Sequence, residues 1–107
     1  MKNIDNDMGE NLKAVIHAAT PEALQRARNN AVNMAKHWPN SEVEIVVNGP
    51  AVPAAIEHPH ATDACLRLCE NSIERFGVEV PETLKTVPAA IVWIIERQKQ
   101  GWHYVSA

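Results

Sequence analysis

The two cysteines, Cys65 and Cys69, carry the most reactive side chains of this chain and lie near its middle. A thiol reacts as its thiolate, and the unpaired N–H groups and positive dipole end at the start of a helix stabilise that anion. If residues 64–68 form a short strand and residues 70–76 a helix, Cys69 lies at the turn between them. We therefore expect any chemistry to centre on Cys69, with its thiol facing outward from the edge of a sheet.

The same segment also fits one continuous helix over residues 62–76. Cys65, Cys69 and Ser72 then share one side of the helix, and the cysteines are small, buried apolar side chains. Arg67 between two leucines favours this helix, and periodicity does not decide in so short a run. From the residues alone, both interpretations stay open.

Three polar residues could assist a thiolate at Cys69. Asn71 and Ser72 follow it closely and could donate hydrogen bonds to it. His17 could help to deprotonate it if the first strand brings the imidazole to the same edge of the sheet. A histidine in a strand is more often a plain packing residue, which is the alternative for His17.

Asn48 and Gly49 follow a predicted strand at residues 43–48, at the end where open α/β sheets place their ligands. Gly49 permits close approach of a backbone, and Asn48 supplies a short polar arm. We therefore include both in the predicted binding site, with a plain turn as the alternative.

A metal site would have to combine His58 and His60 with Cys65 and Cys69. Two histidines on either side of a proline point apart in an extended chain, so we expect solvated loop histidines and no metal. The sequence also lacks a GxGxxG fingerprint, a phosphate-loop lysine motif, a Cys-x-x-Cys pair and a Ser/His/Asp pattern. We expect no cofactor.

Length, composition and charge indicate a single domain without a nucleic-acid partner. The 107 residues are 46% hydrophobic, which is enough for one core. Ten basic and thirteen acidic residues give a net charge of −3, and the basic residues do not cluster.

Neither export nor membrane insertion is indicated. Residues 1–11 form a polar leader without the apolar run of a signal peptide, and the longest apolar stretch, residues 87–95, is too short to span a bilayer. Cysteines four residues apart would not form an undistorted disulfide, which favours reduced thiols. We expect a cytoplasmic protein with no membrane partner.

The chain alternates strands and helices. A helix begins at Thr20-Pro21-Glu22, with an N-cap hydroxyl, a proline at the first position and an acid in the first turn. It joins strands at residues 12–19 and 43–48, and a short helix at 51–57, an edge strand at 85–87, a helix at 88–100 and a strand at 101–105 follow. This order predicts an α/β sandwich with a mostly parallel sheet in one domain, residues 12–107.

The helix at residues 88–100 is apolar nearly all round at its start. Its predicted core face consists of Ile91, Ile94, Ile95 and Gln98. Val92 and Trp93 lie outside this face, so we expect a partner subunit to cover them.

Several segments occur in the order typical of a known family. They are KAVIH at residues 13–17, the asparagines at 29, 30 and 33, VEIVVNG at 43–49, CENS at 69–72, FGV at 76–78, and a tail with VPAAI at 87–91 and QKQGWHYV at 98–105. Together they resemble the DsrE/DsrF-like family with the YchN-like fold, in particular its small uncharacterised branch. No single motif is highly specific, but their order is, and the resemblance extends from Leu12 onward.

The resemblance implies a three-layer sandwich with a five-stranded, mostly parallel sheet, assembled into trimers or hexamers. In sulfur-relay members a cysteine after the third strand carries a persulfide and passes it to a partner. The matching position here is Cys69, which favours a strand before it, although residues 61–68 are shorter and more polar than the usual family strand. Cys65 matches no functional position and is interpreted as structural.

Two functions are therefore expected. The first is sulfur relay: Cys69 is the sulfur-accepting thiol of a persulfide carrier, at most sulfurtransferase-like, with a sulfur donor or acceptor protein as partner. The alternative is a non-catalytic, oligomeric small-ligand-binding or scaffold protein with a pocket near Asn48, Gly49 and Cys69.

Overall fold

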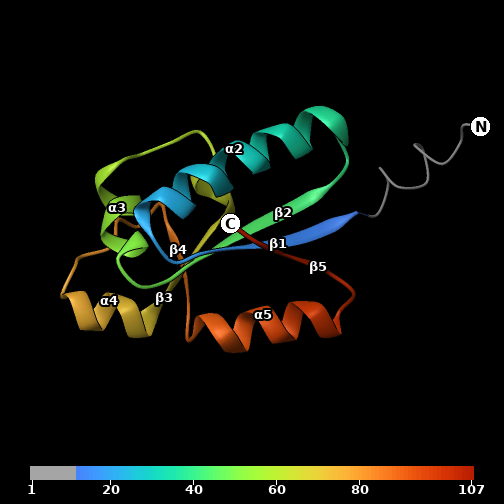
Figure 1. Ribbon diagram of the computed structural model, residues 1–107. Helices are drawn as coiled ribbons and strands as arrows, with labels where there is room; N and C mark the ends of the chain where they lie inside the picture. The colour runs from blue at the N-terminus through green and yellow to red at the C-terminus, as the bar shows by residue number, and fades with distance from the viewer. Residues whose placement is uncertain (1–11) are drawn as a thin grey trace, which may run out of the picture.

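Five parallel strands form the central sheet of the computed structural model, which describes residues 12–107 (Figure 1). The strands are β1 (Lys13–Ala18), β2 (Glu42–Val47), β3 (Leu66–Cys69), β4 (Lys85–Val87) and β5 (His103–Ser106). They lie in the order β4-β3-β2-β1-β5, and every neighbouring pair is parallel. The polar leader predicted at residues 1–11 lies outside the described residues.

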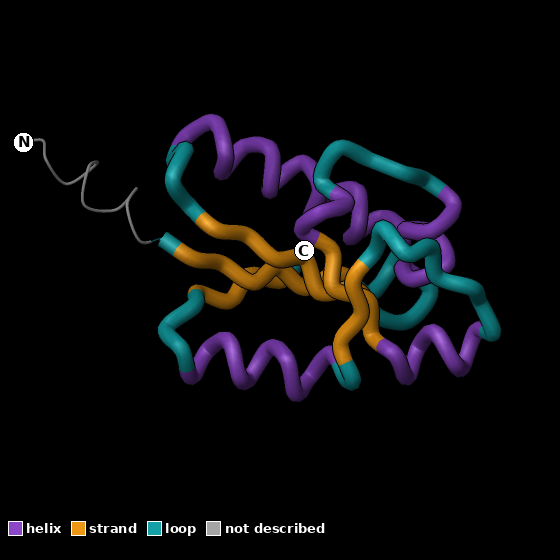
Figure 2. The backbone as a smooth tube through the Cα atoms, turned by 180° about the vertical axis from the view of Figure 1, so that it is seen from behind, coloured by secondary structure: helices purple, strands orange, loops and turns teal. Residues whose placement is uncertain are grey.

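Helices lie on both sides of this sheet, as Figure 2 shows most clearly. One face is covered by α2 (Pro21–His37) and α3 (Ala51–Glu57), and the other by α5 (Ala90–Lys99). The short α4 (Glu70–Phe76) follows β3 directly and lies at the level of α5 in both views. The predicted three-layer α/β sandwich is confirmed, and its sheet is entirely parallel.

The start of α2 follows the local chemistry of its sequence. The Thr20 hydroxyl accepts a hydrogen bond of 3.0 Å from the backbone N–H of Ala23, Pro21 occupies the first turn, and Glu22 provides a negative charge there. Each of these features stabilises a helix N-terminus. The helix buries Leu24 and the small residues Ala23, Ala27 and Ala31 against the sheet.

The central strands are apolar on both faces because each face is covered. Ile16, Ile45, Val47, Leu66 and Leu68 pack beneath α2 and α3, and none of these side chains is more than 1% exposed. Val15, Val46, Cys69 and Trp102 form a second cluster with Ala90 and Ile94 of α5. Strands that are buried on both faces are typical of parallel sheets. In such a sheet the polar side chains lie at the ends of the strands.

The segment before Cys69 is a strand, and the continuous helix over residues 62–76 is wrong. A single 3₁₀ turn at Asp63–Cys65 leads into β3, which begins at Leu66 rather than at residue 64. β3 pairs with β2 through Ile45↔Leu66 and Val47↔Leu68. Because this pairing buries both leucines completely, the sheet overrides the local preference for a helix.

The core face of α5 differs from the prediction. Of the four residues expected there, Ile94 alone is buried, while Ile91 is 66% and Ile95 is 49% exposed. Ala90 joins Ile94 against the sheet.

A buried carboxylate sets this rotation of α5. Glu44 on β2 accepts hydrogen bonds from Trp93 Nε1 at 2.7 Å and from Arg97 Nη2 at 2.6 Å. Both donors lie on α5, so their side chains must face the sheet. Because they occupy that side of the helix, α5 cannot also turn all its apolar residues toward the sheet. Arg97 also stacks over the rings of Trp93 and Trp102, each 4.6 Å away.

Within residues 12–107, no helix is both long and apolar enough to cross a membrane.

Candidate functional site

Cys69 lies where two helices begin. It is the last residue of β3 and the N-cap of α4, with an extended backbone (φ −70°, ψ 120°). In the sheet register it pairs with Val87 at the end of β4, and α5 begins three residues further along that chain, at Ala90. The neighbouring strand ends therefore direct the N–H groups of both α4 and α5 toward the same region.

The pKa of the Cys69 thiol is lowered from its ordinary value by these donors. Burial raises this pKa, but hydrogen bonding by the backbone of Ser72 and Ala90, the Ser72 hydroxyl and the backbone of Asn71 outweighs that effect. In its neutral thiol form, the Cys69 side chain makes no capping hydrogen bond with α4. The donors therefore act chiefly on the charged form, which is the nucleophilic one.

Ser72 connects this thiol to the turn after β2. Its hydroxyl oxygen accepts a hydrogen bond of 2.8 Å from the backbone N–H of Gly49, which leaves the hydroxyl hydrogen available for a thiolate. Gly49 has a positive φ of 60°, and a Cβ on it would lie 3.1 Å from the carbonyl oxygen of Ala19. The turn therefore needs glycine for both its conformation and its packing.

His17 and Asn48 form the other polar pair at this edge of the sheet. His17 Nε2 and Asn48 Oδ1 are 2.8 Å apart, so the imidazole donates from Nε2 and its Nδ1 is left as the potential acceptor. Both residues line a cavity of about 410 Å³ together with Ala90, Ile94, Gln98 and Tyr104. The cavity is mainly apolar, and its polar groups belong to this pair, to Gln98 and to the Tyr104 hydroxyl.

The thiol does not face outward as expected. Cys69 is only 5% exposed, and it does not line the cavity that contains His17 and Asn48. Ala90 links the two, because it lines the cavity while its backbone N–H stabilises the thiolate. The sulfur therefore lies behind the cavity wall, buried by the packing of α5 against the sheet.

The structure brings together most of the predicted site residues. His17, Asn48, Gly49, Ser72 and Cys69 form a connected series at the carboxyl ends of β1, β2 and β3. The Asn71 side chain is exposed, and this residue contributes through its backbone instead. Sequence reasoning missed the backbone of Ala90, although it predicted a helix over residues 88–100, which contains this position.

Cys65 has a different environment. It is partly exposed in the turn before β3. Burial is the main cause that raises the pKa of its thiol above the ordinary value; attraction to Arg67 offsets part of this rise, and repulsion by the Glu44 carboxylate adds a smaller increase. Cys65 is therefore the poorer nucleophile of the two.

Among residues 12–107, no three His, Cys, Asp or Glu side chains are grouped as metal ligands would be.

The fold and this edge of the sheet define an α/β protein with an all-parallel, five-stranded sheet and a buried thiol after its third strand. A solved structure has a similar fold: a protein of unknown function, MTH1491, from Methanobacterium thermoautotrophicum. The TM-score is 0.73 at 16% sequence identity, over 90% of this chain and 99% of the other. At this identity the similarity shows the fold alone. No family model matches the sequence, and neither does any curated protein.

Proposed function

We propose that this protein is a sulfur carrier of the DsrE/DsrF-like kind, with Cys69 as the thiol that accepts a sulfane sulfur. The observation that carries the proposal is the set of donors from Ser72, Ala90 and Asn71 that lowers the pKa of Cys69. The opposite shift of the Cys65 pKa supports the choice between the two cysteines. Sulfur transfer requires a thiolate as the nucleophile, and a lowered pKa favours that form.

The transfer is a thiol–persulfide exchange. The Cys69 thiolate attacks the outer sulfur of a donor persulfide, R–S–SH, and a new S–S bond forms as the donor S–S bond breaks. The donor leaves as R–S⁻, which takes up the proton that its persulfide carried, so Cys69 holds a persulfide anion and no net oxidation occurs. An acceptor thiolate removes the sulfur by the same step in reverse.

The donors around Cys69 suit both charged states of this exchange. Backbone N–H groups at two helix starts and the Ser72 hydroxyl stabilise an anion whether it is a thiolate or a persulfide. His17 is hydrogen-bonded to Asn48 in the adjoining cavity, where its free Nδ1 could accept a proton from an incoming acceptor thiol. Because Cys69 is buried, transfer also requires the cavity wall at Ala90 to move aside.

Intact mass after incubation with a sulfane-sulfur donor tests the proposal. We expect an added mass of about 32 Da, one sulfur atom on a thiol, in the wild type and in Cys65→Ser. The adduct should be lost in Cys69→Ser and on treatment with a reductant. An adduct that persists in Cys69→Ser, or the absence of any adduct in the wild type, would refute a carrier role for Cys69.

The second candidate is a non-catalytic small-ligand-binding protein. The cavity of about 410 Å³ favours it, because apolar walls with a few convergent polar groups are typical of small-molecule sites. In this case His17→Ala and Asn48→Ala abolish ligand binding while Cys69→Ser does not. A sulfur adduct on Cys69 combined with no ligand binding in the wild type would exclude this alternative.

We also propose that the protein is a homo-oligomer, a trimer or hexamer by its resemblance to the family. Four exposed apolar residues on the α5 side of the sheet support this: Ile91, Val92, Ile95 and Tyr104. Three of them, Ile91, Ile95 and Tyr104, line the cavity. A second copy or a sulfur donor or acceptor protein seated there would therefore cover the entrance to the site.

A further inference from the structure

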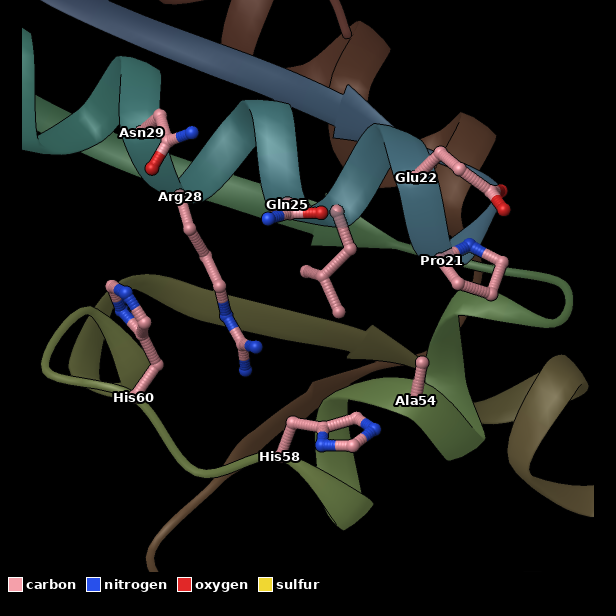
Figure 3. Close-up of a pocket in the computed structure, with 9 residues that line it drawn as sticks. Pro21, Glu22, Gln25, Arg28, Asn29, Ala54, His58 and His60 are labelled. Atoms are coloured by element: carbon pink, nitrogen blue, oxygen red, sulfur yellow. The ribbon is translucent and has the colours of Figure 1, made fainter.

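A second cavity lies on the opposite side of the sheet from Cys69, between α2, α3 and the loop at residues 58–60 (Figure 3). It has a volume of about 460 Å³. Its polar lining includes Gln25, Arg28 and Asn29 from α2 and His58 and His60 from the loop. In Figure 3 the Arg28 side chain extends from α2 into the space between the two histidines.

Arg28 is a buried cation whose hydrogen-bonding capacity is largely unused. The residue is 6% exposed. Its contact with Asp63 is a single hydrogen bond of 3.2 Å, from Nη2 to Oδ1. Its Nε is buried without a hydrogen-bond partner among the described residues. A guanidinium carries five N–H donors, and a buried charge is costly unless its donors are satisfied.

His60 supplies a second donor with a fixed orientation. Its Nδ1 accepts a hydrogen bond of 3.1 Å from the backbone N–H of Thr62 and lies 2.9 Å from the Thr62 hydroxyl. Because Nδ1 is an acceptor, the neutral ring carries its hydrogen on Nε2. The loop is held in turn by Asp63, which accepts a hydrogen bond of 3.1 Å from the His60 backbone. Asp63 thus positions both Arg28 and His60.

The charges and the apolar lining together indicate the kind of ligand. Asp63 offsets part of the Arg28 charge through one bond, and the carboxylate of Glu22 points away from Arg28 in Figure 3. The donors face a space that also contains the apolar side chains of Leu24 and Ala54. An anionic group at Arg28 with an apolar portion on Leu24 and Ala54 would satisfy both parts.

We propose that this cavity binds a small organic anion, whose carboxylate or phosphate group is held by Arg28 and His60. The cavity is separated from Cys69 by the sheet, so the proposal is independent of sulfur transfer. Nothing in it requires an oligomer, because all the donors come from one chain.

Titration of the full-length, ¹⁵N-labelled protein followed by amide NMR shifts tests this proposal. Sodium malonate and inorganic phosphate are the two probes, each compared with sodium chloride at the same ionic strength. We expect saturable shifts for residues 25–29 and 58–63 with at least one probe and none with chloride. Saturation by malonate alone assigns a carboxylate ligand. Saturation by phosphate alone assigns a phosphate ligand, and saturation by both probes assigns a site that binds either anionic group.

Two variants on the same helix form a matched pair. Arg28→Gln should abolish saturable binding, whereas Arg26→Gln should retain it, because Arg26 is exposed and bonds to the carbonyl oxygen of Ala107 instead. If Arg28→Gln does not fold, His60→Gln replaces it, with an expected weakening of about tenfold for the loss of one hydrogen bond to an anion. Shifts that do not saturate with either probe, or equal binding by Arg26→Gln and the cavity variant, would overturn the proposal.

Discussion

At the scale of single residues, the Ser72 hydroxyl is the side chain on which Cys69 most depends. It accepts the Gly49 N–H at 2.8 Å and contributes to lowering the pKa of Cys69. Removing it leaves the backbone donors of Asn71, Ala90 and Ser72 itself in place. The lowering of the Cys69 pKa therefore has two parts. Mutation of Ser72 can remove the side-chain part, but it cannot remove the part that comes from the backbone.

Ser72→Ala should raise the pKa of Cys69, because it removes one hydrogen bond to the charged thiolate, a contribution of roughly 1.5 kcal/mol. The rate of alkylation as a function of pH, in a Cys65→Ser background, measures this change. In the parent the rate should rise at a pH below that of an ordinary thiol, and Ser72→Ala should move the rise to higher pH. Ser41→Ala is the control, and an equal effect of both would contradict the role given to Ser72.

Glu44 is the residue that holds α5 in place. It is 4% exposed and accepts from Trp93 and Arg97, with Arg67 also 3.3 Å away. We expect Glu44→Gln to lower the free energy of unfolding by about 3 kcal/mol, because it leaves the partly buried cations Arg67 and Arg97 without their counter-charge. Denaturant unfolding measures this, and Glu96→Gln, an exposed pair with Lys99, should cost under about 0.5 kcal/mol.

The same carboxylate should make stability depend on acid. Burial raises the pKa of Glu44, but its bonds to Arg97 and Trp93 and the charges of Arg67 and Arg97 lower it below its ordinary value. Its stabilising contribution is therefore complete well above the unfolded pKa of about 4.3 and is lost as the pH falls through the lower folded value. Unfolding free energies between about pH 6 and 3 should thus fall more steeply in the wild type than in Glu44→Gln. Parallel curves would show that Glu44 is not the group responsible.

At the scale of elements, the turn between β2 and α3 determines how α4 meets the sheet. Gly49 and Gly77 have nearly equal φ angles, +60° and +63°, but a Cβ at Gly49 would lie 3.1 Å from a backbone oxygen, whereas a Cβ at Gly77 would meet nothing within 4 Å. The two glycines thus separate conformational strain from packing. The strain is common to both, and the contact belongs to Gly49 alone.

Gly77→Ala should cost about 1 kcal/mol for the left-handed backbone alone. Gly49→Ala should cost more than this and should also raise the pKa of Cys69, because moving the turn displaces the partner of Ser72. Thermal unfolding and the pH dependence of alkylation provide the two measurements. If both variants lose the same stability and neither changes Cys69, the turn does not position the thiol.

At the scale of the whole molecule, the apolar surface of α5 and β5 is the feature that a single chain leaves unexplained. Val92 is 56% exposed, and Ile91 and Tyr104 on the same side of the sheet are also exposed. The architecture shared with MTH1491 accounts for the fold but not for this surface. Burying such residues between subunits contributes about 1.5–3 kcal/mol per fully covered side chain.

Val92→Glu should therefore dissociate the proposed oligomer, as measured by light scattering after size-exclusion chromatography. Val32→Glu on α2 is the matched control, since Val32 is 36% exposed on the opposite face of the sheet, and it should leave the mass unchanged. A wild-type mass equal to one chain at all concentrations would contradict the proposed assembly.

The sequence by itself determined the order of the elements outside residues 62–76, the start of α2 at Thr20-Pro21 and the polar turn at Asn48-Gly49. These depend on neighbouring residues, through caps, proline and glycine, so local chemistry is enough. Tertiary structure alone decided that residues 66–69 form a strand, because pairing with β2 buries Leu66 and Leu68. It also decided which side of α5 faces the sheet, since Glu44 and Arg97 are 53 residues apart in the chain. The burial of Cys69 has the same cause: the backbone of Ala90 meets its sulfur only when two strands lie side by side.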